Sequence, residues 1–365
     1  MKFIPGLELS QYFFEDALRP LLQEAFPGID YAAARLGWGS DVLGFDTDMS
    51  MDHGWGPKIT LFLEEADYAV YHEKMQEYFA YNLPFEVRGF PTHFGEPYED
   101  GGVMAFKSTY PIHHMVTITT PERFFADYLG VDIQQPLTAQ KWLTLPSQKL
   151  RTIRYGRIYH DGLGRLSEIR QRFHWYPHDL WIYILANQWQ RIDQEEPFLG
   201  RTGSVSDELG SQLIAARLIR DIMNLVFLME KEYAPYNKWF GTAFKKLALS
   251  EDLLPLFDAV LSSHHWQQRE AIMSQVYLRL AEAHNSLGLT PEIQPCITNF
   301  HKRPFLVPHT SRFVNALLEA ITDPEVLALP RQIGSINQIV DNTDVLENNA
   351  HCQSLQSLYQ PPNSA

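Results

Sequence analysis

Hydrophobic residues recur along this chain with two different spacings, and the spacing changes near residue 121. Before that point, short apolar or alternating runs predict β-strands at residues 32–36, 58–63 and 115–120. Helical spacing predicts helices at residues 10–26 and 66–81, and residues 84–94 are expected to be extended. The first third of the chain is therefore predicted to combine helices with a small sheet.

After residue 121, apolar residues recur mainly at intervals of three or four, which predicts helices almost throughout. These helices are expected at residues 122–129, 139–154, 163–173, 178–193, 207–233, 252–262, 265–286 and 311–322. The clearest is 207–233, in which Ile214, Leu218 and Ile222 share one face.

Together the two patterns predict an α+β protein. We expect an N-terminal domain with a small mixed sheet at residues 1–121 and a larger all-helical domain at residues 122–345. Residues 346–365 are rich in Asn, Gln and Ser, and this composition predicts a disordered tail.

The charge of the chain narrows the choice of partners. Its 365 residues include 30 Lys and Arg against 44 Asp and Glu, which gives a formal net charge of −14. An acidic surface repels nucleic-acid phosphates and anionic lipids, so we expect neither extended nucleic acid nor a membrane as a partner. The two cysteines form no disulfide framework, and the early acidic residues are untypical of a signal peptide. These features predict a cytoplasmic protein, and they leave its oligomeric state open.

Candidate chemistry is concentrated in residues 37–56, which follow the first predicted strand and contain four Asp, one His and five Gly. A strand that ends in Gly39-Ser40 and turns into a short helix presents N–H groups and a hydroxyl to a phosphate. Carboxylates from the next strand can then hold a divalent metal against the same phosphate. The alternative is an ordinary loop, because Gly, Asp and Ser are common between strands.

The spacing of this cluster resembles that of nucleotidyltransferase-fold proteins, the class of the aminoglycoside nucleotidyltransferases. In that class, Gly-Ser is followed after roughly ten residues by Asp-x-Asp; here eleven residues separate Ser40 from Asp52. Longer segments, among them GSDVLGFDTDMSMDHGWGP and RTGSVSDELGSQLIAARLIRD, resemble a bacterial family of that fold called domain of unknown function 4037. The likeness extends over nearly the whole chain.

The resemblance implies a function and a set of site residues. It implies transfer of a nucleoside monophosphate from a nucleoside triphosphate such as ATP to a small-molecule or protein acceptor. Gly39 and Ser40 would bind the nucleotide, and Asp52 would be the catalytic carboxylate and a ligand of Mg²⁺, with Asp46 and Asp48 as further candidate ligands.

Cations of the helical domain extend this predicted nucleotide site. Arg217 and Arg220 lie on one face of the helix predicted at 207–233, and Lys238 follows it; these three are expected to contact the nucleotide. The alternative for the two arginines is ordinary pairing with carboxylates along their own helix.

The sequence departs from the family pattern at two acidic positions. Gly54 stands where the second Asp of Asp-x-Asp belongs, and Thr117 stands on the third strand where the resemblance leads us to expect Glu. Glu86 is a possible substitute, although an exposed strand Glu is the commoner explanation. The alternative function is therefore a catalytically degenerate protein of this fold that acts as a ligand-binding or regulatory module. Whether the protein is an enzyme is left open.

One further motif, Tyr159-His160-Asp161-Gly162, has two interpretations. A His beside an Asp is a candidate for acid–base chemistry or metal binding. Consecutive residues do not share a face, however, and Asp-Gly favours a turn, so a structural turn is the preferred interpretation.

Overall fold

The computed structural model of the chain describes residues 2–95 and 102–360 and divides into two compact units. Unit 1 comprises Met1–Pro136 and Lys149–His174, and unit 2 comprises Leu137–Gln148 and Trp175–Ala365. The sequence places the boundary at residue 121, but the chain continues to contribute helices and a strand to unit 1 beyond that point. The boundary therefore differs because the sheet of unit 1 is completed by residues far along the chain.

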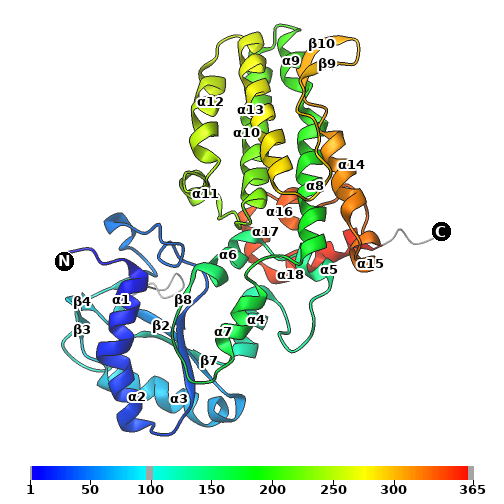
Figure 1. Cartoon of the computed structure of the whole chain (residues 1–365). Coiled ribbons are helices and arrows are strands. Elements are labelled where there is room, and N and C mark those ends of the chain that lie inside the picture. Colours follow the sequence, from blue (N-terminus) through cyan, green and yellow to red (C-terminus); the bar gives the residue numbers. More distant parts are fainter. Residues whose placement is uncertain (1, 96–101, 361–365) are drawn as a thin grey trace. The chain divides into compact units, whose positions relative to one another are not determined.

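A four-stranded mixed sheet forms the centre of unit 1 (Figure 1). Its strands are β1 (Tyr31–Arg35), β2 (Lys58–Leu63), β7 (Met115–Thr119) and β8 (Arg157–Asp161), in the order β7-β2-β1-β8. Strand β1 is antiparallel to β2 and to β8, whereas β2 and β7 are parallel. The three strands predicted from the sequence are confirmed, as is the α+β class.

Strand β8 was not expected. Its sequence, RIYHD, mixes polar and apolar residues, and the structure makes it an edge strand that is only partly buried. The predicted turn follows it, since the Gly164 N–H donates to the Asp161 carbonyl. The turn interpretation was thus right for Asp161-Gly162 and wrong for the residues before it.

Helices cover both faces of the sheet. On one face, α1 (Gly6–Tyr12), a π-helical segment (Phe13–Leu18) and α2 (Arg19–Ala25) pack with α3 (Glu65–Asn82) around Phe13, Phe79, Leu61 and Val116. On the other face, α4 (Pro121–Leu129) places Phe124 edge-on against Phe62, with ring centroids 5.3 Å apart. Further elements of the unit are the short strands β3 (Glu86–Val87), β4 (Phe90–Pro91), β5 (Phe94–Gly95) and β6 (Val103–Met104), a 3-10 helix (Asp48–Ser50), α7 (Leu166–Arg172) and most of α6 (Ser147–Tyr155).

Unit 2 consists mainly of helices, of which α8 (His178–Glu195), α10 (Glu208–Met229) and α13 (Trp266–Ser286) lie side by side (Figure 1). The Asp207 carboxylate caps α10 by accepting a hydrogen bond from the Gly210 N–H. Further helices before residue 340 are α5 (Ala139–Leu143), α9 (Phe198–Gly203), α11 (Asn237–Phe244), α12 (Ser250–Ser262), α14 (Ser311–Ala320), α15 (Pro324–Leu327) and α16 (Ile336–Ile339). The unit is not all helical as expected, because β9 (Thr298–Phe300) pairs with β10 (Arg303–Val307).

The predicted disordered tail is ordered over most of its length. Helices α17 (Thr343–Glu347) and α18 (Asn349–Ser354) are followed by a 3-10 helix (Leu355–Tyr359). Tyr359 is 1% exposed and its hydroxyl donates to the Gly334 carbonyl. The polar composition of this segment was a poor guide to disorder, because a few apolar residues face inward and hold the segment against the rest of the unit. The rest of the predicted tail, residues 361–365, lies outside the described residues.

Two buried carboxylates hold the segment around β10 in unit 2. The Glu196 carboxylate accepts hydrogen bonds from the backbone N–H and the hydroxyl of Thr310. Burial raises the pKa of Glu196 to about 7, although the bonds from Thr310 oppose the shift. Burial likewise raises the pKa of Glu270 to about 7, against a hydrogen bond from the Leu306 backbone. Folding therefore favours the protonated form of both groups.

These two groups predict a pH-dependent stability. Because their ordinary pKa is 4.5, these two groups bind more protons in the folded than in the unfolded chain between about pH 4.5 and 7, and their contribution to stability falls as pH rises through that window. We expect Glu270→Gln to raise the free energy of unfolding at pH 8 by about 1–2 kcal/mol and to flatten its pH dependence. Urea unfolding at pH 5 and pH 8 measures this. Glu251→Gln, on the exposed side of α12, is the control, and an equal loss of stability by Glu270→Gln at both pH values would contradict the prediction.

Candidate functional site

A cavity of about 210 Å³ lies in unit 1 at the end of the sheet where β1 finishes and β2 and β7 begin. Antiparallel pairing of β1 with β2 and parallel pairing of β2 with β7 bring these three strand ends to the same edge. The cavity is lined by Arg35, Leu36, Gly37, Trp38, Gly54, Lys58, Ile59, Thr60, Met115, Thr117, Phe124 and Tyr128. Its wall therefore combines cations, aromatic rings and hydroxyl groups.

A buried ion pair forms one side of the cavity. Arg35, the last residue of β1, donates from Nε and Nη2 to the two carboxylate oxygens of Asp41 at 2.7 and 2.9 Å. Two further donors of the guanidinium reach the carbonyls of Leu36 and Trp38. Burial alone would raise the pKa of Asp41, but the charges of Arg35 and Lys58 and the hydrogen bond from Arg35 hold it below its ordinary value. The turn that follows β1 is thus fixed around a single guanidinium.

Gly39 is required by this ion pair. Its φ angle is +146°, and a Cβ at this position would lie 2.1 Å from Asp41 Oδ1 and 2.6 Å from Arg35 Nη2. Any side chain would separate the two charged groups. The glycine that the sequence assigned to nucleotide binding therefore makes room for the Arg35–Asp41 pair.

Lys58 brings a second positive charge to the cavity. It is the first residue of β2, and its ammonium group donates a hydrogen bond to the Gly54 carbonyl. Burial, followed by the nearby charge of Arg35, lowers the pKa of Lys58 to about 8, and Asp41 offsets only part of this effect. Two basic groups thus share one carboxylate at the cavity wall.

Aromatic rings form another wall. Phe124 and Tyr128 lie one turn apart on α4 and are stacked with centroids 5.7 Å apart. The Tyr128 hydroxyl is bonded to Thr152 Oγ1 at 2.6 Å. Trp38 is 62% exposed, so one large ring is open to a ligand. Rings beside basic groups suit an anionic ligand that also carries an aromatic part.

The phosphate site predicted at Gly39-Ser40 is not formed as expected. Residues 40–44 make turns instead of a helix, so no helix N-terminus is presented after β1. Ser40 is half-buried and is not among the residues that line the cavity. The Arg35–Asp41 pair explains the difference, because it draws the chain back toward the end of β1.

The acidic residues of the cluster do not converge on the cavity either. Asp46 Oδ2 accepts hydrogen bonds from the Gly6 backbone at 2.7 Å and from Trp55 Nε1 at 2.9 Å, which attaches the start of α1 to this loop. Asp48 begins a short 3-10 helix (Asp48–Ser50) and is exposed, as is Asp52. None of these three lines the cavity.

A magnesium site of the implied kind does not fit these residues. Within residues 2–95 and 102–360, no three His, Cys, Asp or Glu side chains are grouped to hold a metal ion. Thr117 lies opposite Thr60 in the register of β7 and β2, and hydroxyls stand there without a carboxylate among the cavity residues. Glu86, the possible substitute, is exposed on β3 and does not line the cavity. The cavity wall is basic instead of acidic.

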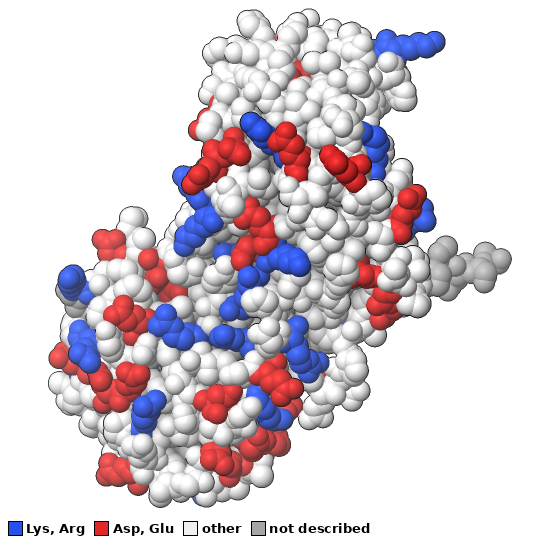
Figure 2. Space-filling view, in the orientation of Figure 1, with Lys and Arg blue, Asp and Glu red and all other residues white. Residues whose placement is uncertain are grey.

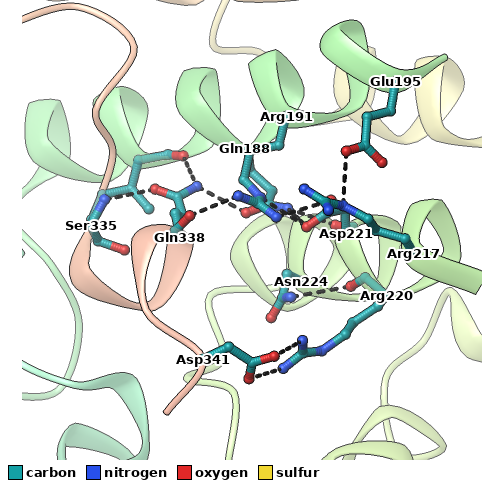
Figure 3. A network of polar contacts seen from close by, with 11 residues as sticks. Gln188, Arg191, Glu195, Arg217, Arg220, Asp221, Asn224, Ser335, Gln338 and Asp341 are labelled. Carbon is teal, nitrogen blue, oxygen red and sulfur yellow. Dashed lines mark hydrogen bonds and ion pairs between the residues drawn. The ribbon is translucent and has the colours of Figure 1, made fainter. Parts of the chain in front are cut away.

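In unit 2, the predicted nucleotide-binding arginines are paired with carboxylates of other elements (Figure 3). Arg217 Nε lies 2.8 Å from Glu195 at the end of α8. Arg220 donates from two nitrogens to Asp341 at 2.5 and 2.6 Å. The pairing is between elements, so it differs from the intrahelical alternative as well. Lys238 lies over the ring of Trp239 at 5.1 Å.

The same network joins α8, α10 and the segment around α16 (Figure 3). Arg191 donates to both oxygens of Asp221, which is 4% exposed, and to the Gln338 carbonyl. Gln338 in turn donates to Gln188 Oε1 at 2.9 Å and accepts from the Ser335 backbone. Arg217 and Arg220 border a network that holds unit 2 together, and this accounts for their position without a ligand.

Sequence reasoning missed Arg35, Asp41 and Lys58. A signal was present, since Arg35 is the last residue of β1 and Lys58 the first residue of β2, and both strands are otherwise mostly apolar. On the face of the molecule drawn in Figure 2, basic and acidic side chains are interspersed, which agrees with the mixed charge of the sequence.

No helix in the described part of the chain combines the length and apolar character needed to cross a membrane.

Comparisons with known proteins show a likeness to a family over part of this chain. Residues 142–240 match the model of a family described as domain of unknown function DUF4037, which confirms the predicted resemblance for that region. No curated protein matches the chain. A solved nucleotidyltransferase-like protein from Exiguobacterium sibiricum is similar over 79% of this chain and 83% of its own, at 11% identity and a TM-score of 0.32. A similarity at that score does not establish a shared fold. The candidate site is therefore argued only from the residues that line the cavity.

The Arg35–Asp41 pair predicts that Gly39 is sensitive to substitution. We expect Gly39→Ala to lower the free energy of unfolding by about 2–4 kcal/mol, because the methyl group displaces a buried carboxylate from its guanidinium. Gly44→Ala is the matched control: its φ is +67° and nothing lies within 4 Å, so only the backbone cost of about 1 kcal/mol remains. Thermal unfolding of the two variants tests this, and equal losses would disprove it.

The unit 2 network predicts a similar contrast between two arginines. Arg191→Ala leaves the buried Asp221 carboxylate with reduced compensation and should cost about 2–4 kcal/mol of stability. Arg220→Ala removes a pair whose side chains are 46% and 62% exposed, so it should cost no more than about 1 kcal/mol. Urea unfolding compares them, and a larger loss for Arg220→Ala would show that the burial argument is wrong.

Proposed function

We propose that this DUF4037-related chain binds a nucleoside phosphate in the cavity of unit 1 and acts as a ligand-binding or regulatory module. The observation that carries the proposal is the charge of the cavity wall. Arg35 and Lys58 share the single carboxylate of Asp41, and the cavity opens beside them. A ligand phosphate would supply the missing negative charge.

Burial makes this imbalance significant. Arg35 is 6% and Asp41 3% exposed, so their charges cannot be screened by water as surface charges are. Burial makes a positive charge without a full partner energetically unfavourable. Such a charge is stabilised when an anion binds beside it. Charge-assisted hydrogen bonds from Lys and Arg to phosphate oxygens are among the strongest that proteins make.

The remaining wall of the cavity fits the organic part of a nucleotide. The exposed ring of Trp38 offers a face on which a base can stack, an interaction worth about 1–3 kcal/mol. Thr60 and Thr117 lie opposite each other on β2 and β7 and offer hydroxyls to a ribose. The volume of about 210 Å³ admits a phosphate with part of its substituent, while the base rests at the mouth.

The same geometry favours binding over nucleotidyl transfer. Transfer in the resembling class depends on carboxylates that hold metal ions against the reacting phosphate. Asp52, the predicted catalytic residue, is exposed and does not line the cavity, and Thr117, which does line it, is no carboxylate. Transfer to an acceptor would need a different set of residues from those that form the cavity.

Calorimetric titration with ATP and with AMP in EDTA tests the binding proposal. We expect both nucleotides to bind, with affinity reduced roughly 10- to 100-fold by Lys58→Ala, which removes a charge-assisted contact. Trp38→Ala should weaken both nucleotides by a similar factor through loss of stacking and should leave inorganic phosphate unaffected. Lys74→Ala, an exposed lysine of α3, is the matched control and should change nothing. Absence of binding at millimolar nucleotide would overturn the proposal.

Asp52→Ala separates the module from the transferase. The module predicts unchanged nucleotide binding by this variant and no transfer of label from α-labelled ATP with Mg²⁺ to any acceptor. Transfer that depends on Asp52 would instead establish the enzyme predicted from the sequence resemblance.

A further inference from the structure

The charged residues around the cavity differ in sign from those that a metal-dependent nucleotide site needs. A divalent ion between protein and phosphate requires carboxylate or other oxygen ligands on the protein side. Here the charged side chains that line the cavity are Arg35 and Lys58, and the adjacent Asp41 is engaged by Arg35 through both of its oxygens. A cation placed among these groups would be repelled.

We propose that Lys58 takes the place of a metal ion in this cavity, so that phosphate binding is independent of divalent metal and is accompanied by uptake of a proton at Lys58. This inference rests on the proposed nucleoside-phosphate binding and specifies its chemistry. The ammonium would neutralise the phosphate together with Arg35.

The position of Lys58 suits this role. Its backbone is fixed as the first residue of β2, paired in register with Met115 of β7. One of the three ammonium donors is directed to the Gly54 carbonyl, which leaves donor capacity for a ligand. Four of the five N–H donors of Arg35 are engaged by Asp41 and two carbonyls, so Arg35 contributes charge more than new hydrogen bonds.

The proton uptake follows from the groups that face Lys58. Arg35 on β1 opposes its charge, Asp41 in the turn after β1 supports it, and β7 contributes uncharged residues to the cavity. On α4, Tyr128 lines the cavity, with Lys149 Nζ 5.6 Å from its ring. With a pKa of about 8, Lys58 is about half charged at pH 8 in the free protein. A phosphate dianion beside it favours the charged form.

Titration with AMP tests this inference, because its phosphate is already a dianion above pH 8 and releases no proton of its own. Calorimetry in two buffers of different ionisation enthalpy, with EDTA present, measures the proton uptake. We expect an uptake of about half a proton per bound AMP at pH 8 and of more at pH 9, where the phosphate is fully a dianion. Replacing EDTA with Mg²⁺ should change the affinity less than about twofold, since AMP itself binds this metal weakly.

The variant Lys58→Arg separates this role from a structural one. Arginine remains charged at these pH values, so the variant should keep the affinity within about threefold and lose the proton uptake. Lys58→Ala should lose the proton uptake and bind AMP roughly 10- to 100-fold more weakly, with its folding checked by circular dichroism. Binding of AMP that requires Mg²⁺, or that takes up no proton at pH 8, would overturn this inference and leave the proposed function standing. Absence of AMP binding in either condition would overturn the proposed function itself.

Discussion

The Arg35–Asp41 ion pair is the interaction on which the candidate site depends. It joins the last residue of β1 to the turn that follows, and it fixes that turn through four hydrogen bonds from one guanidinium. Position 39 needs glycine because its φ angle is one that other residues rarely adopt and because the pair occupies the space where a side chain would stand. Both carboxylate oxygens of Asp41 accept hydrogen bonds from Arg35, so the charge of Lys58 is only partly compensated. The character of the cavity thus follows from how one buried carboxylate is divided between two cations.

In unit 2, by contrast, each arginine of the polar network has a carboxylate of its own. Arg191, Arg217 and Arg220 each meet a carboxylate from another element, and the amides of Gln188 and Gln338 complete the hydrogen bonding (Figure 3). Charges that are matched in this way stabilise the packing of helices and leave little to attract a ligand. Basic residues alone are therefore a poor guide to a binding site, and the balance of charge around them is a better one.

Most of the helices and strands could be predicted from the sequence, but few of the contacts between them could. Strands β1, β2 and β7 were found because each is a short apolar or alternating run, whereas β8 escaped because an edge strand tolerates polar residues on both faces. The helix face of Arg217 and Arg220 was identified correctly, but Asp341 lies 121 residues from Arg220, and no local pattern indicates such a contact. Gly39 was singled out because the resemblance implied a phosphate contact, and the structure shows a steric need for glycine that the sequence did not indicate.

The origin of β8 has a consequence for how unit 1 comes into being. The strand that pairs with the outer edge of β1 ends only at Asp161, after the chain has already contributed Leu137–Gln148 to the other unit. During synthesis, part of unit 2 is therefore translated before the last residues of unit 1. A fragment cut at residue 121 would leave β1 with an open edge, directly beside the arginine that organises the cavity. For this chain, the smallest piece that contains the complete sheet is set by hydrogen bonding across β1 and β8 and not by the change of sequence pattern at residue 121.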